Sequence, residues 1–155
     1  MKKLVPFLVL VCYTAVVCAQ DRDALRLLYR DATKSEAQAQ AFYAPLATVT
    51  KSDDPVLVAY KGAGLMLLAR YEKLTARGAK VKEAVPWIEQ AVADEPNNAE
   101  IRLIRLSVQE HLPKFLKYND NIEADRQFVE QALPEIEDAG LKAMINGYFD
   151  SFSTD

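Results

Sequence analysis

Residues 81–100 read VKEAVPWIEQAVADEPNNAE, and this stretch carries the clearest helical signals of the chain. The pattern of apolar residues ends at Asp94-Glu95-Pro96, because the residue before a proline is disfavoured in helical geometry. Asn97 or Asn98 then suits the N-cap of a following helix. Apolar residues before this turn recur at offsets of three, four, seven, ten and eleven, which is the spacing of one helix face: Val81, Ala84, Val85, Ile88, Ala91 and Val92. The stretch predicts two helices joined by a short turn.

Helical patterns fill the rest of the chain as well. No stretch alternates apolar and polar residues in the manner of a strand, and no hairpin turn separates two β-branched runs. The third predicted helix is apolar around most of its circumference and should pack on more than one side. Gly78 indicates a loop over 75–80, and 114–121 reads as a structured connector. The predicted helices cover 22–33, 35–49 with a kink at Pro45, 55–74, 81–93, a fifth that contains 101–108, 120–133 and 139–152.

Three helix starts carry capping signals. Ser35 with Gln38 three residues later suits a capping box. Asp54 precedes a proline, which is favoured at the first helical position. Asp120 with Glu123 predicts a third such start.

The first 19 residues read as an export signal. Lys2 and Lys3 form a basic start, an apolar run covers 4–17, and the small residue Ala19 suits cleavage before Gln20. We expect a signal peptide over 1–19 and a single all-helical domain over 20–155, which is periplasmic or secreted. An uncleaved anchor and a lipid attached to Cys18 stay open as alternatives. No later segment approaches the roughly 20 apolar residues of a spanning helix, so no transmembrane segment is expected after signal removal.

Removal of the signal changes the cysteine count and the charge. Both cysteines, Cys12 and Cys18, lie in it, so the mature chain of about 136 residues has no disulfide and depends on its core. Without its two signal lysines the chain has 17 basic and 22 acidic residues, a net charge of −5. Nucleic acid is not an expected partner, because phosphate backbones select basic surfaces.

Residues 60–100 resemble the tetratricopeptide repeat. The small residues of the repeat's second helix fall on Ala84 and Ala91, its large packing residue on Ile88 and its turn proline on Pro96. Four upstream residues have the spacing of its first helix: Tyr60, Ala63, Gly64 and Leu67. The resemblance implies an all-α fold, a short tetratricopeptide-like α-solenoid of stacked helical hairpins with about six to seven helices.

The sequence also departs from the repeat. Gly64 and Ala84 are twenty residues apart, where the family has about twelve, so this hairpin has extra residues. The flanking helices could be degenerate repeats, since about three units are needed to bury a continuous core. The mature chain also resembles small exported helical proteins of Bacteroidota-type bacteria.

The sequence offers little for catalysis. His111 is its one histidine and the mature chain has no thiolate, so we expect no metal site and no cofactor. Ser107 lies four residues before His111 on the same helical face, but a histidine at a helix end ordinarily interacts with the last carbonyls. Paired carboxylates such as Asp53-Asp54 suit helix starts. We therefore expect no catalytic residue and no enzyme.

Polar residues of the fifth helix and the connector are the candidate binding residues. In tetratricopeptide-like stacks such side chains line a groove that holds peptide carboxylates, and arginine offers bidentate donors to a carboxylate. The alternative is that these arginines pair with acidic residues of neighbouring helices. The candidate peptide-binding residues are Arg102, Arg105, Gln109, Lys114 and Lys117.

Two functions from different classes remain open. The favoured one is an exported, non-catalytic helical-repeat module that binds a protein or peptide. The alternative is a small-molecule-binding protein or an accessory subunit of an envelope enzyme complex, with a pocket around Tyr60, Tyr71 and Trp87. An open groove lined by Arg102 and Arg105 would favour the first, and a closed apolar cavity the second. A purely structural bundle is the third possibility.

Overall fold

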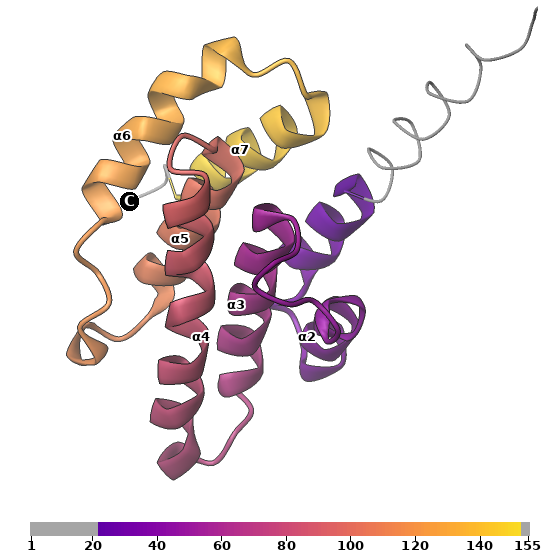
Figure 1. Ribbon diagram of the computed structural model, residues 1–155, viewed down its shortest axis with the longest axis vertical. Helices are drawn as coiled ribbons and strands as arrows, with labels where there is room; N and C mark the ends of the chain where they lie inside the picture. The colour runs from indigo at the N-terminus through magenta and orange to yellow at the C-terminus, as the bar shows by residue number, and fades with distance from the viewer. Residues whose placement is uncertain (1–21, 153–155) are drawn as a thin grey trace, which may run out of the picture.

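The computed structural model describes residues 22–152, and these residues form seven α-helices and no strand (Figure 1). The all-α fold of six to seven helices is therefore confirmed. The predicted signal peptide lies outside the described residues. The helices are an N-terminal helix over 22–31, α2 (Glu36–Tyr43), α3 (Pro55–Ala69), α4 (Leu74–Asp94), α5 (Ala99–His111), α6 (Ile122–Ala132) and α7 (Ala139–Phe152). Short 3₁₀ turns occur at η1 (Ala44–Leu46), η2 (Lys114–Leu116) and η3 (Leu133–Glu135).

Helix starts were largely predictable from their caps. The Ser35 hydroxyl accepts a hydrogen bond from the backbone amide of Gln38 at 3.2 Å. The Asp54 carboxylate accepts one from the backbone amide of Val56 at 2.9 Å. The Asn98 side chain accepts hydrogen bonds from two backbone amides at the start of α5. These three predictions are confirmed. The proline at position 45 ends α2 at residue 43 and places a 3₁₀ turn after it, since a proline supplies no amide hydrogen.

The start of α6 differs from the prediction. The helix begins at Ile122, and no side chain caps it, so the capping box at Asp120 was wrong. The backbone amide of Asn121 instead donates to the side-chain oxygen of Gln109 at 3.2 Å. The start of α6 is therefore fixed from α5, which a local pattern could not reveal.

The boundary between α3 and α4 also differs. α3 ends at Ala69 and α4 begins at Leu74, so the predicted loop over 75–80 is helical. Gly78 lies inside α4, where an added Cβ would meet nothing within 4 Å. One glycine costs a helix only about 1 kcal/mol relative to alanine, and the rest of this helix offsets that cost.

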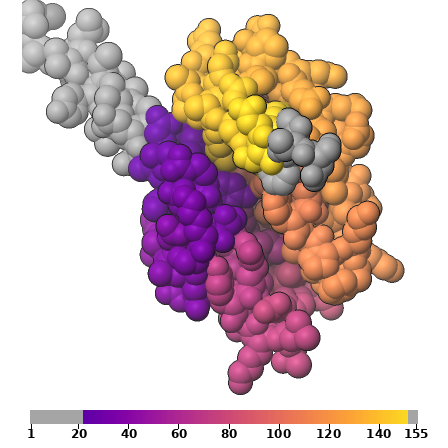
Figure 2. All heavy atoms as spheres, turned by 180° about the vertical axis from the view of Figure 1, so that it is seen from behind, coloured from indigo at the N-terminus to yellow at the C-terminus, as the bar shows by residue number. Residues whose placement is uncertain are grey.

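The helices stack around α3, which lies between α2 on one side and α4 and α5 on the other (Figure 1). Twelve of its fifteen residues are buried, which confirms that it packs on more than one side. Figure 2 shows α7 against α6 and beside the N-terminal helix. A smaller core between α5, α6 and α7 contains Leu103, Leu106, Val129 and Ile145. No helix within 22–152 has the length and apolarity needed to cross a bilayer.

α3 and α4 approach each other closely at Gly62. A Cβ added there would lie 2.6 Å from Cγ1 of Ile88 and 3.1 Å from the carbonyl oxygen of Ala84. Gly64, the glycine of the repeat-like pattern, instead faces Tyr43. The small residue that lets these two helices meet is thus two positions earlier than the resemblance implied.

Gly62→Ala is expected to lower the free energy of unfolding by about 1–3 kcal/mol, because the new methyl group overpacks the contact with Ile88. Gly78→Ala is the matched control, since it has open space and should raise that free energy by about 0.5–1 kcal/mol. Urea denaturation measures both. Equal stability of the two variants would contradict the close packing at Gly62.

Candidate functional site

Arg105, a predicted peptide-binding residue, lies inside the molecule and is 4% exposed. Its Nε and Nη2 donate to the two carboxylate oxygens of Asp125 at 2.6 and 2.8 Å, and its Nη1 donates to Glu89 at 3.1 Å. Burial alone would lower the pKa of Arg105, but the bond and charge of Asp125 outweigh it and raise that pKa. Arg105 is thus paired with acidic residues of neighbouring helices, which was the alternative interpretation of the sequence.

Arg102 contacts α6, and Gln109 contacts the residue just before it. Arg102 forms an ion pair with the same Asp125 carboxylate, and its guanidinium lies 4.8 Å from the ring centroid of Phe128. Gln109 is buried and bonds the backbone amide and the side chain of Asn121. These predicted residues meet at the interface of α5 and α6 and do not line a groove.

Lys117 lines a surface groove, and Lys114 is exposed one turn before it. We call this hollow the connector groove; it has a volume of about 260 Å³ and lies between α4 and the segment after η2. Its apolar residues come from both sides of the hollow. The groove is lined by Val81, Lys82, Val85, Pro86, Leu116, Lys117 and Tyr118.

The connector groove carries unpaired polar groups. Neither Lys82 nor Lys117 forms an ion pair with a carboxylate of residues 22–152. Pro86 lies inside α4 and has no amide hydrogen, so the carbonyl of Lys82 lacks its usual helical donor. Lys117 has a left-handed backbone with φ 52°, and residues other than glycine adopt it at a cost. The groove is therefore lined by two cations without an ion-pair partner in 22–152 and by four apolar residues.

Partly buried hydrogen bonds hold Tyr118, which lines one wall of the groove. The Tyr118 hydroxyl donates to Glu89 at 2.6 Å, and Glu89 also accepts from Arg105. Burial, and then the bond to Glu89, raise the pKa of Tyr118 far above its usual range. This chain of bonds connects Tyr118 to Asp125 in α6 and restricts the position of the Tyr118 side chain.

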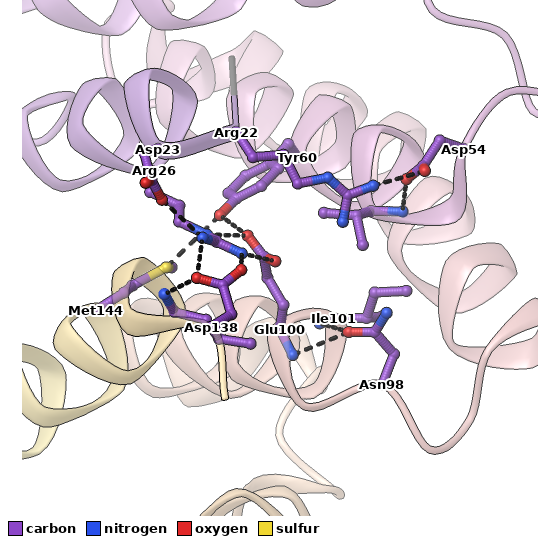
Figure 3. A network of polar contacts seen from close by, with 12 residues as sticks. Arg22, Asp23, Arg26, Asp54, Tyr60, Asn98, Glu100, Ile101, Asp138 and Met144 are labelled. Carbon is purple, nitrogen blue, oxygen red and sulfur yellow. Dashed lines mark hydrogen bonds and ion pairs between the residues drawn. The ribbon is translucent and has the colours of Figure 1, made fainter. Parts of the chain in front are cut away.

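A second polar cluster lies in the core, around Arg26 of the N-terminal helix (Figure 3). Its Nε and Nη2 donate to the two oxygens of Glu100 at 2.9 and 2.7 Å, and both residues are almost fully buried. Its terminal nitrogens also donate to Asp23 and Asp138 at 2.8 to 3.0 Å. The Tyr60 hydroxyl donates to Glu100 at 2.6 Å. One guanidinium thus joins the N-terminal helix, α5 and the segment before α7.

The charges of this core cluster are all paired. Burial alone would lower the pKa of Arg26, but its bonds to Glu100 and Asp138 outweigh it and raise that pKa. Partial burial would raise the pKa of Asp138, but bonds from Arg26 and the amide of Leu141 lower it. Arg26 stays cationic and Asp138 anionic, so the cluster acts as a tie between helices. Sequence analysis missed it, because Glu100 looks like an ordinary acid in the first turn of a helix.

His111 has the helix-end position that its sequence context suggested. Its Nδ1 lies 2.6 Å from the backbone oxygen of Ser107. The Ser107 hydroxyl donates to the carbonyl of Ile104 and lies 2.6 Å from the hydroxyl of Tyr29. Burial raises the pKa of Tyr29 to about 12. Across 22–152, no group of three or more His, Cys, Asp or Glu side chains could hold a metal ion.

The three aromatic residues of the alternative pocket have separate surroundings. Tyr60 is fully buried beside Tyr29 and Phe42, and Tyr71 is 39% exposed at the end of α3. The ring of Trp87 lies 4.5 Å from Nζ of Lys61, which also donates to the carbonyls of Ala47 and Val49.

Comparisons with known proteins give no relative. No family model matches the chain, and neither a curated protein nor a solved structure matches it. The function is therefore argued from the site alone.

Proposed function

We propose that this chain is an exported, non-catalytic helical module that binds an acidic peptide segment of another protein in the connector groove. One observation supports the proposal above the others. Lys82 and Lys117 line the groove beside its apolar residues and have no carboxylate partner within 22–152. A peptide with Asp or Glu beside an apolar residue supplies both missing partners.

The size of the groove favours a peptide side chain over a small-molecule ligand. Sites for drug-sized molecules have volumes of roughly 300–1,000 Å³, and the connector groove has about 260 Å³. The side chains of Lys82 and Lys117 can bind acidic residues of the peptide on either side of that apolar residue. The predicted residue Lys114 is exposed beside the groove and adds a third cation.

The proposal includes a tetratricopeptide-like stack of helices and export of the chain. The α3–α4 pair carries the repeat-like residues, and stacked helical pairs commonly bind peptides on their surfaces. The signal-like first 19 residues support a periplasmic or secreted location in a bacterium.

Selection from a displayed library of random peptides tests the proposal. Enriched peptides should carry an apolar residue flanked by Asp or Glu. The dissociation constant of a selected peptide, measured by titration calorimetry, should rise about tenfold in Lys82→Glu/Lys117→Glu, because two attractive contacts become repulsive.

Arg30→Glu/Lys34→Glu is the matched control, since it changes the net charge equally at two exposed residues, one in the N-terminal helix and one in the turn after it. This control should bind the peptide within twofold or so of the unaltered chain. An equal loss of affinity in both variants, or selected peptides without acidic residues, would refute the proposal.

A further inference from the structure

The end of the α3–α4 hairpin protrudes beyond the rest of the described chain (Figures 1 and 2). We call residues 70–77 the hairpin tip; it contains the turn and the first residues of α4. Leu74 is 80% exposed and Tyr71 is 39% exposed at this tip. Two large apolar side chains therefore face outward at the most projecting part of the hairpin.

The charge around the tip is opposite to that of the whole chain. The hairpin tip includes three basic residues and one acidic residue, although the chain has a net charge of −3. Arg70, Lys73 and Arg77 are exposed, and none forms an ion pair with a carboxylate of residues 22–152. The Arg77 side chain donates instead to the backbone oxygen of Glu72 at 3.0 Å. The exposed apolar side chains thus lie in a segment with one acid, Glu72, and three cations that have no ion-pair partner among the described residues.

We infer that the hairpin tip binds an anionic lipid surface, with Leu74 and Tyr71 in the interfacial layer and Arg70, Lys73 and Arg77 on the headgroups. Transfer of a leucine side chain from water into this layer is favourable. A tyrosine ring suits the same layer, because its body is apolar and its hydroxyl is polar. Clustered Lys and Arg side chains are attracted to anionic headgroups. The inference concerns a surface separate from the connector groove.

The shape of the tip favours a lipid surface over an acidic protein. A protein partner would need a hollow complementary to a projecting leucine, whereas the interfacial layer of a bilayer adapts to the side chains that enter it. The aliphatic stems of Lys73 and Arg77 can also lie along the layer while their charges stay with the headgroups.

Sedimentation with vesicles tests the inference. The chain over 20–155 should bind phosphatidylcholine vesicles that contain about 30% phosphatidylglycerol at about 50 mM salt, and salt at about 500 mM should release it. Lys73→Gln/Arg77→Gln should lower the partition coefficient about 25-fold, since each cation near the surface contributes roughly fivefold. Leu74→Ser should lower it about tenfold through the loss of apolar burial.

Arg30→Gln/Lys34→Gln is the matched control, because it removes the same charge from the end of the N-terminal helix and the turn after it. This control should retain vesicle binding. Circular dichroism during thermal unfolding should show that every variant is folded at the temperature of the binding experiment. Absence of binding to the phosphatidylglycerol vesicles overturns the inference, as does an equal loss in the control. Binding to polyglutamate beads that depends on the tip, without vesicle binding, would assign the tip to an acidic protein and would also overturn it.

Discussion

Asp125→Ala is expected to lower the free energy of unfolding by about 3–5 kcal/mol, among the largest effects of any single substitution in this chain. The Asp125 side chain has no exposed surface and pairs with both Arg102 and Arg105. Its removal leaves the buried guanidinium of Arg105 with Glu89 as its remaining partner among the contacts described above. A buried charge that loses its partner costs far more than a surface pair contributes. Urea denaturation followed by circular dichroism measures the difference.

Asp120→Ala provides the control for that substitution. Asp120 is exposed just before the start of α6, and its removal changes the net charge by the same amount. We expect a change within about 0.5 kcal/mol. If Asp125→Ala were no more destabilising than Asp120→Ala, the pairing of Arg105 across α5 and α6 would be wrong.

Arg26→Met is expected to lower the free energy of unfolding by a similar amount, about 3–5 kcal/mol. Methionine preserves much of the apolar stem, so the loss comes mainly from the charge. Glu100 is 1% exposed and would keep only the hydroxyl of Tyr60 among the side-chain donors described here. The variant therefore leaves a carboxylate buried without its cation.

A double-mutant cycle separates the charge from the packing. Adding Glu100→Gln to Arg26→Met removes the uncompensated carboxylate, and the amide can still accept from Tyr60. The double variant should be more stable than Arg26→Met alone, with a coupling of about 1–3 kcal/mol. If the losses of unfolding free energy were strictly additive, Arg26 and Glu100 would act independently. That result would contradict the two hydrogen bonds between their side chains.

Helix positions were largely predictable because their signals are local. Ser35, Asp54 and Asn98 satisfy amides two or three residues away, so the pattern and the bond involve the same short stretch. The boundary at 70–73 was missed because one local signal was misinterpreted. A glycine was read as a loop, but Gly78 faces open space and its helix continues through it.

The partners of the polar residues were not predictable in the same way. The sequence indicates that Arg105 needs a carboxylate, but Asp125 is twenty residues away and is selected by the packing of α6 on α5. Arg26 and Asp138 are 112 residues apart. The connector groove likewise depends on Lys82 and Lys117 meeting across two elements, and only Lys117 was among the predicted residues. Its role in peptide binding stays a prediction.

The long separation of the Arg26 contacts also orders events during synthesis. A ribosome adds roughly 5–20 residues per second, so Asp138 follows Arg26 by roughly 6–20 seconds. Throughout that interval the N-terminal helix lacks one of its ties, and until Glu100 appears it lacks the main one. The N-terminal helix thus depends for its place in the fold on residues that are synthesised only after most of the chain has been made.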